Sequence, residues 1–120
     1  MAPEDLMDLM GEKVQEAFKM EKYQMEDGSI VNCEKASRSW DEARDWDGSN
    51  HISRATGSQW YHETLYRSRK GRFYKVCESQ WQGSSPHAEW VDEREATRWL
   101  LMNDHEIPEN LVHLIDDVEE

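Results

Sequence analysis

The clearest structural signal in the sequence is the stretch WYHETLYRSRKGRFYKVCESQW, residues 60–81. Both halves of this stretch are rich in aromatic and β-branched residues, which favour strands in half-buried sheets. A tight turn of Arg-Lys-Gly at 69–71 separates the two halves. The combination predicts a β-hairpin with arms at about 60–68 and 72–81.

The length of this turn sets which residues of the two arms face each other. If the loop consists of residues 70–71 alone, the numbers of facing residues sum to 141. This register places Leu65 opposite Val76, which is favourable. It also places Glu63 opposite Glu78, and like charges directly opposite each other destabilise a sheet. The sequence therefore leaves the register open.

Further strands and helices are predicted on both sides of the hairpin. Residues 88–91 have the composition of a third strand, and residues 29–33 are compatible with another short strand. Apolar residues recur every three or four positions over 3–22, 93–103 and 108–117, which predicts amphipathic helices. A proline stands at the start of the first and the last of these helices, where proline is tolerated.

The segment 35–58 carries no consistent pattern. Ser39 and Glu42 fit a capping box at the start of a helix, but the segment 40–46 has few apolar positions and is equally compatible with a loop. Residues 51–59 are mostly small and polar, which is typical of a structured loop. No element is assigned to this part of the chain.

The predicted elements together indicate one α+β domain over residues 1–120, with a sheet core at about 28–91. A chain of 120 residues can bury one hydrophobic core but not two large ones. Asp92, followed three residues later by Glu95, has the pattern of a helix N-cap after the last strand. We expect a small antiparallel sheet, with the N-terminal helix and the two C-terminal helices packed on one face.

The charge of the chain is its strongest bulk property. The 26 acidic residues exceed the 14 basic ones by 12, which gives a net charge of −12. A field of this sign repels nucleic acid and anionic lipid and attracts basic protein surfaces. We therefore expect no direct binding to nucleic acid and no membrane binding. The alternative is that the charge only keeps a small protein soluble and monomeric.

Motifs for catalysis, metal binding and cofactor binding are missing from the sequence. Cys33 and Cys77 are far apart and form no C-x-x-C pair, and the five histidines show no metal-binding spacing. His62 and Cys77 lie on adjacent arms of the hairpin, where we interpret them as packing partners. No phosphate-cradling glycine loop or nucleophile motif occurs. The sequence predicts a protein that is not an enzyme and has no metal and no cofactor.

The beginning of the chain is acidic and lacks the basic start and apolar run of a signal peptide. No stretch approaches the roughly 20 apolar residues of a membrane-spanning helix. We expect the protein to remain in the cytoplasm.

Acidic residues gather near both ends of the chain and no Lys or Arg lies among them. If the terminal helices pack side by side, their carboxylates form one acidic face able to occupy a basic cleft. The alternative is the ordinary solvated face of an amphipathic helix. The candidate partner-binding residues are Asp104, Glu106, Glu109, Asp116, Asp117, Glu119 and Glu120, together with Glu4, Asp5, Asp8 and Glu12.

A second candidate interface lies on the hairpin. Basic residues cluster around its turn and could contact an acidic partner or merely protect a sheet edge. Six tryptophans are also more than one small core readily buries, so one or two are expected on a binding surface. The residues of this alternative interface are Trp60, Trp81, Arg67, Arg69, Lys70 and Arg72, with Lys75 counted in the same basic cluster.

Several phrases of the sequence resemble uncharacterised small acidic proteins encoded by phages, prophages and plasmids. They lie at 50–52, 57–60, 63–68, 79–84 and 95–101, within a similarity that spans about residues 28–112. The resemblance brings no catalytic residues. It implies a context in which short acidic proteins often inhibit host nucleic-acid enzymes, as anti-CRISPR and anti-restriction proteins do.

The resulting hypothesis is a non-enzymatic inhibitor from a mobile genetic element. Its partner would be the basic nucleic-acid-binding site of a host nuclease or other defence protein, with carboxylates acting as phosphate surrogates. The alternative is a structural or regulatory interaction module. It would dock through exposed tryptophan and the basic hairpin turn, and a homodimer is one form it could take.

Overall fold

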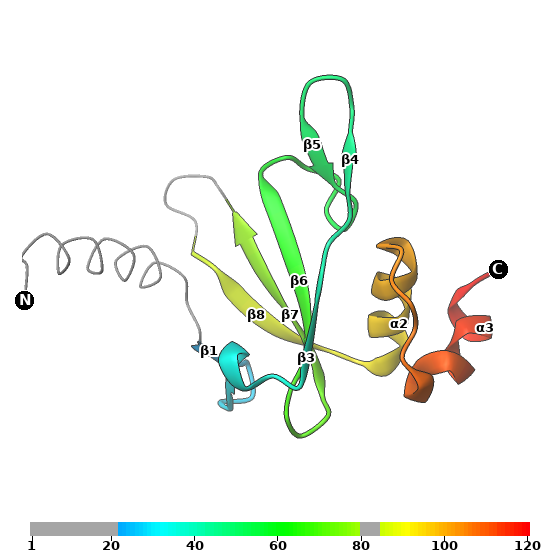
Figure 1. Cartoon of the computed structure of the whole chain (residues 1–120). Coiled ribbons are helices and arrows are strands. Elements are labelled where there is room, and N and C mark those ends of the chain that lie inside the picture. The colour runs from blue at the N-terminus through cyan, green and yellow to red at the C-terminus, as the bar shows by residue number, and fades with distance from the viewer. Residues whose placement is uncertain (1–21, 80–84) are drawn as a thin grey trace, which may run out of the picture.

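The computed structural model describes residues 22–79 and 85–120 (Figure 1). The predicted helix at 3–22 falls outside these residues except for Lys22, and so does Trp81. The described chain combines antiparallel sheets with helical segments near the C-terminus. The prediction of an α+β fold is confirmed.

The centre of the fold is a four-stranded antiparallel sheet. The predicted hairpin forms its two middle strands, and the predicted third strand pairs alongside. A strand from the segment without a predicted element completes the other edge. In spatial order the strands are β3 (Arg38–Asp41), β6 (Tyr61–Arg67), β7 (Phe73–Ser79) and β8 (His87–Val91).

Two smaller sheets accompany the central one. β1 (Lys22–Gln24) pairs with β2 (Ile30–Asn32), and the 3-10 turn η1 (Cys33–Lys35) follows β2. The strand expected near 29–33 therefore exists, but it belongs to a separate two-stranded sheet. β4 (Arg44–Trp46) pairs with β5 (His51–Ser53), and this hairpin projects beyond the central sheet (Figure 1).

The turn between β4 and β5 is closed by its own residues. The backbone N–H of Asp47 donates to the carbonyl oxygen of Asn50 at 3.1 Å. The Asp47 carboxylate accepts from the backbone N–H groups of Ser49 and Asn50 at 2.8 and 2.7 Å. All residues of this turn are exposed, so its hydrogen bonds do not involve the protein core.

The register of the β6–β7 hairpin differs by one residue from the register that a two-residue loop gives. Thr64, rather than Leu65, faces Val76, and Glu63 faces Cys77 instead of Glu78. Of the registers that the sequence left open, the one with Leu65 opposite Val76 is therefore not the one observed. The shift also removes the unfavourable pairing of two glutamates.

The longer turn explains this shift. The N–H of Gly71 donates to the Ser68 carbonyl at 2.9 Å, and the N–H of Ser68 donates to the Arg72 carbonyl at 2.7 Å. Three residues, 69–71, thus form the loop, and Gly71 has a φ of 92°. A three-residue loop that ends on a glycine in the left-handed region is a common hairpin connection.

The C-terminal part of the chain is helical, as predicted. α2 (Glu93–Met102) begins after Asp92, whose carboxylate accepts from the Glu95 N–H at 2.7 Å as the N-cap pattern requires. The predicted helix at 108–117 consists of the 3-10 segment η2 (Glu109–Leu114) followed by the short helix α3 (Ile115–Val118).

Each face of the central sheet contributes to a hydrophobic core. On one face the helices enclose a core of Trp40, Leu65, Phe73, Val91, Ala96, Trp99, Leu100 and Leu111. On the other face β1 and β2 enclose a core of Tyr23, Met25, Val31, Tyr74 and Val76. The described helices thus lie on one face, as expected, while a small β-hairpin covers the opposite face, which the sequence did not indicate.

The segment 35–58 contains three strands where the sequence suggested a helix or loops. Trp40 explains the difference, because it is 4% exposed and its ring centroid lies 6.0 Å from that of Phe73. Burial of this ring against β6 and β7 favours an extended β3 over the helix that Ser39 and Glu42 suggested at 40–46. The loop expected at 51–59 likewise begins with β5.

Replacing Gly71 with Ala should lower the free energy of unfolding by about 1 kcal/mol, because an L-residue is strained at this φ. Gly71→Asn should cost less, since Asn tolerates the left-handed region better. Urea denaturation followed by tryptophan fluorescence measures both changes. Equal stability of the two variants and the unmodified protein would contradict the three-residue turn.

Candidate functional site

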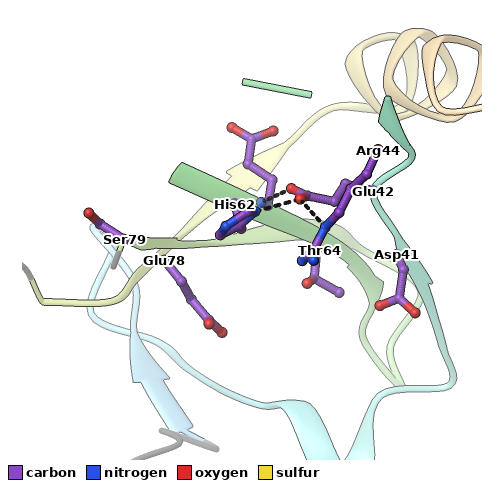
Figure 2. Close-up of a pocket in the computed structure, with 8 residues that line it drawn as sticks. Asp41, Glu42, Arg44, His62, Thr64, Glu78 and Ser79 are labelled. Atoms are coloured by element: carbon purple, nitrogen blue, oxygen red, sulfur yellow. Dashed lines mark hydrogen bonds and ion pairs between the residues drawn. The ribbon is translucent and has the colours of Figure 1, made fainter. Parts of the chain in front are cut away.

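A cavity of about 440 Å³ opens at the end of the central sheet where β3, β6 and β7 meet the start of β4. Figure 2 shows the side chains of His62 and Arg44 converging on Glu42. The lining residues are polar throughout: Asp41, Glu42, Arg44, His62, Glu63, Thr64, Glu78 and Ser79.

The carboxylate of Glu42 organises the site. One oxygen, Oε1, accepts from the Ser53 hydroxyl at 2.8 Å and from the Glu63 backbone N–H at 2.6 Å. The other, Oε2, lies 2.6 Å from His62 Nδ1 and accepts from Arg44 Nε at 3.1 Å. The Glu42 side chain is only 4% exposed, so these four partners replace the water it would otherwise bind.

Burial and hydrogen bonding act in opposite directions on the acidity of Glu42. Burial raises the pKa of the carboxyl group, because it disfavours the charged form. The hydrogen bonds from Glu63, His62 and Ser53 outweigh burial and hold the pKa below its ordinary value. The carboxylate is therefore ionised at neutral pH and joins β5 and β6 to the start of β4.

His62 is oriented by Glu42 in the way a carboxylate orients a catalytic imidazole, but the rest of such an arrangement is missing from the described residues. If Nδ1 donates to Glu42, Nε2 is the ring nitrogen left to act as a base. Nε2 is buried and has no hydrogen-bond partner in the described structure. Cys77 faces Glu63 on the next strand and lies on the other face of the sheet from His62.

Cys77 belongs to a second polar cluster, beneath α2. Its thiol lies 3.9 Å from the Glu63 carboxylate, and burial together with that negative charge raises the pKa of Cys77 to about 12. Trp99 donates its indole N–H to Glu63 at 3.0 Å. Lys75 lies 3.2 Å from Glu89 and 3.5 Å from Glu63. The structure thus places Lys75 among carboxylates and not in the basic cluster at the hairpin turn.

The C-terminal acids are mostly displayed to solvent. Asp104 is 76% exposed but forms an ion pair, because its carboxylate lies 2.5 Å from the Arg54 guanidinium. Within residues 22–79 and 85–120, no basic side chain pairs with the other six predicted acids, all of them exposed: Glu106, Glu109, Asp116, Asp117, Glu119 and Glu120. Glu4, Asp5, Asp8 and Glu12 fall outside the described residues, so a joint face of both termini stays a prediction.

The residues of the alternative interface, the basic hairpin turn and the tryptophans, do not form one surface among the described residues. Arg69 and Lys70 are exposed at the hairpin turn, and Trp60 is 40% exposed at the far end of β6. The Arg72 guanidinium lies over the Trp90 ring, 3.7 Å from its centroid. Arg67 is only partly exposed, and its Nε is buried without a hydrogen-bond partner in the described structure. The turn and Trp60 therefore lie at opposite ends of one strand.

Sequence reasoning missed Glu42, His62 and Ser53 as a group. In the sequence Glu42 fits a capping box, and its partners Ser53, His62 and Glu63 lie 11 to 21 residues away in the chain. No local pattern marks the group, because β3 ends at Asp41 and the partners of Glu42 lie on β5 and β6.

No protein-family model, no curated protein and no solved structure matches this chain. In the part of the chain that the structure describes, no group of three or more His, Cys, Asp or Glu residues could hold a metal ion. None of the described helices has the length and apolar character needed to cross a membrane.

Replacing Glu42 with Gln should lower the free energy of unfolding by about 2 kcal/mol at neutral pH, because hydrogen bonds to a charged group are lost. The folded pKa of Glu42 lies below its usual value of 4.5, so this stabilisation is complete above about pH 4.5 and disappears as pH falls through the folded pKa. The difference between the two proteins should therefore be constant near neutral pH and narrow as the pH falls below about 4.5.

Denaturant unfolding at stepped pH measures this difference. Asp41→Asn is the matched control, because Asp41 lines the same cavity but is exposed, and it should change stability by less than about 0.5 kcal/mol. A difference between Glu42→Gln and the unmodified protein that does not depend on pH would contradict the role assigned to the charged carboxylate.

Proposed function

We propose that the protein is a non-enzymatic acidic inhibitor, encoded by a mobile genetic element, that binds the basic nucleic-acid-binding site of a host defence protein. The supporting observation is the set of six exposed C-terminal carboxylates without ion pairs to described basic residues. A surface that replaces phosphates must offer negative charges that its own chain has not neutralised. Such an inhibitor, of anti-CRISPR or anti-restriction type, would act in the cytoplasm of the host cell.

The way this segment is anchored supports the proposal. Leu111 in η2 is fully buried in the helix-side core, and Ile107 and Leu114 pack against the same core. Arg94 of α2 donates to the backbone carbonyl of Asp117 at 3.1 Å, which holds α3 against α2. Carboxylates presented from an anchored segment lose less conformational entropy on binding than those of a free tail.

The net charge of −12 would add a long-range contribution to binding. A strongly acidic protein is drawn toward a basic cleft before contact, which raises the association rate at low ionic strength. Salt screens this attraction over about 8 Å at physiological concentration. The proposal therefore requires fast binding that weakens steeply as salt is added.

Neutralising Asp117, Glu119 and Glu120 to the corresponding amides should weaken capture of the partner and leave the fold intact, because all three side chains are exposed. A pull-down of the tagged protein from host lysate, washed at stepped salt concentrations, measures the loss. The captured protein should also lose nucleic-acid binding when the unmodified inhibitor is added.

The control variant carries Glu26→Gln, Glu34→Gln and Glu78→Gln, which remove the same charge from exposed positions outside the C-terminal segment. This variant should retain the partner to higher salt than the C-terminal variant. Equal weakening in both would show that only net charge matters. Unchanged capture by the C-terminal variant at low salt would refute the proposed role of these acids.

A structural or regulatory interaction module is the second candidate function, and the exposure of Trp60 favours it. A tryptophan at a protein interface contributes mainly through burial of its ring, which salt does not screen. Trp60→Ala should then abolish capture of a partner that survives washing at high salt, with Trp46→Ala, at another exposed tryptophan, as the control. Retention of the partner by Trp60→Ala would exclude this interface.

A further inference from the structure

A basic groove of about 380 Å³ lies where the β1–β2 hairpin meets the turn between β6 and β7. It gathers basic side chains from β1, η1 and the hairpin turn, together with the Trp90 ring of β8. The basic lining residues are Lys22, Lys35, Arg69, Lys70 and Arg72, and none of the groove's described lining residues is acidic.

This concentration of positive charge runs against the composition of the chain. Five of its 14 basic residues line one groove, although acidic residues outnumber basic ones by 12. Arg72 is partly neutralised by Asp27, 3.7 Å away. Within the described residues, the cations of Lys22, Lys35, Arg69 and Lys70 have no acidic partner. Four like charges held in one groove repel each other, so an anion between them would be stabilised.

The walls of the groove are fixed to each other by hydrogen bonds. Ser37, just after η1, donates its backbone N–H to the Arg67 carbonyl at 2.8 Å. At the other wall the Trp90 indole donates to Asp27 at 3.2 Å, and the Arg72 guanidinium stacks on the same ring. The groove is therefore preformed and does not depend on a ligand to bring its basic residues together.

We propose that this groove binds a compact phosphate-bearing ligand. Lysine and arginine are the side chains that hold phosphate oxygens, with arginine able to bind two oxygens at once. A volume of about 380 Å³ suits a small molecule. A nucleic-acid strand would extend beyond the groove into the field of a protein with charge −12, which disfavours the longer polyanion.

This inference does not depend on the proposed inhibitor function, because the groove shares no residue with the C-terminal acids. The two surfaces also require opposite charges on their ligands. A variant that loses phosphate binding at the groove can therefore still be tested for binding to the partner of the C-terminal acids, and the reverse also holds.

The test is a titration with inorganic pyrophosphate at low salt, followed by calorimetry and by NMR of the backbone amides. We expect saturable binding, with the largest chemical-shift changes at η1 and at the turn 68–72. The double variant Lys35→Gln, Lys70→Gln should weaken binding at least tenfold, because two exposed cations of the groove are removed.

The matched control is Arg38→Gln with Arg98→Gln, which produces the same net charge from exposed positions outside the groove. It should retain pyrophosphate affinity within about twofold. Equal loss in both double variants, or no saturable shifts at the groove, would overturn the proposal. So would tighter binding of a single-stranded oligonucleotide, or a concentration-dependent dimer that the groove variant abolishes, because each assigns the groove to another occupant.

Discussion

Neighbouring residues of β7 are buried on opposite faces of the central sheet: Phe73 in the core beneath α2, and Tyr74 in the core beneath β1 and β2. A strand with apolar side chains on both faces must be covered on both sides, because either face would otherwise expose large rings to water. The C-terminal helices cover one face and the β1–β2 hairpin covers the other. The layered arrangement of the described chain follows from this requirement.

The two covers also separate the charges of the molecule. The acidic segment of η2 and α3 lies on the helix side of the central sheet, while the basic groove is built partly from β1 and η1 on the other side (Figure 1). The basic side chains in the groove are thus kept away from the carboxylates of the C-terminal segment, although Arg72 pairs with Asp27. A chain with a large negative charge can retain one positively charged surface in this way.

Local signals predicted the hairpin, the third strand and α2, because each carries its evidence within a few residues. Asp92 and Glu95, for example, are three positions apart and form the expected cap. The strand β3 could not be assigned this way, since Trp40 is fixed by Leu65 and Phe73, more than twenty residues away. The sequence left the register open because a loop of residues 70–71 and a loop of residues 69–71 both end on Gly71 and differ only in whether Arg69 belongs to the loop.

The candidate sites also differ in whether their residues lie close together in the sequence. The C-terminal acids could be read directly from the chain, because exposure of charged residues on an amphipathic segment is the ordinary outcome. The site around Glu42 and the basic groove could not be read from it, since each joins residues from several distant segments. Lys75 shows that a cluster of basic residues in the sequence need not be a cluster in space. It is close to the hairpin turn in the chain, but its ammonium group lies among carboxylates beneath α2.

The turn between β4 and β5 has a consequence for how this fold can change. Because Asp47 satisfies the backbone groups of its own turn and no core side chain depends on them, the chain can lengthen here without disturbing either core. The entropic cost of a longer loop grows only slowly with its length. This tip is therefore where related chains could accept inserted segments, and where a reporter group could be attached with the least effect on folding.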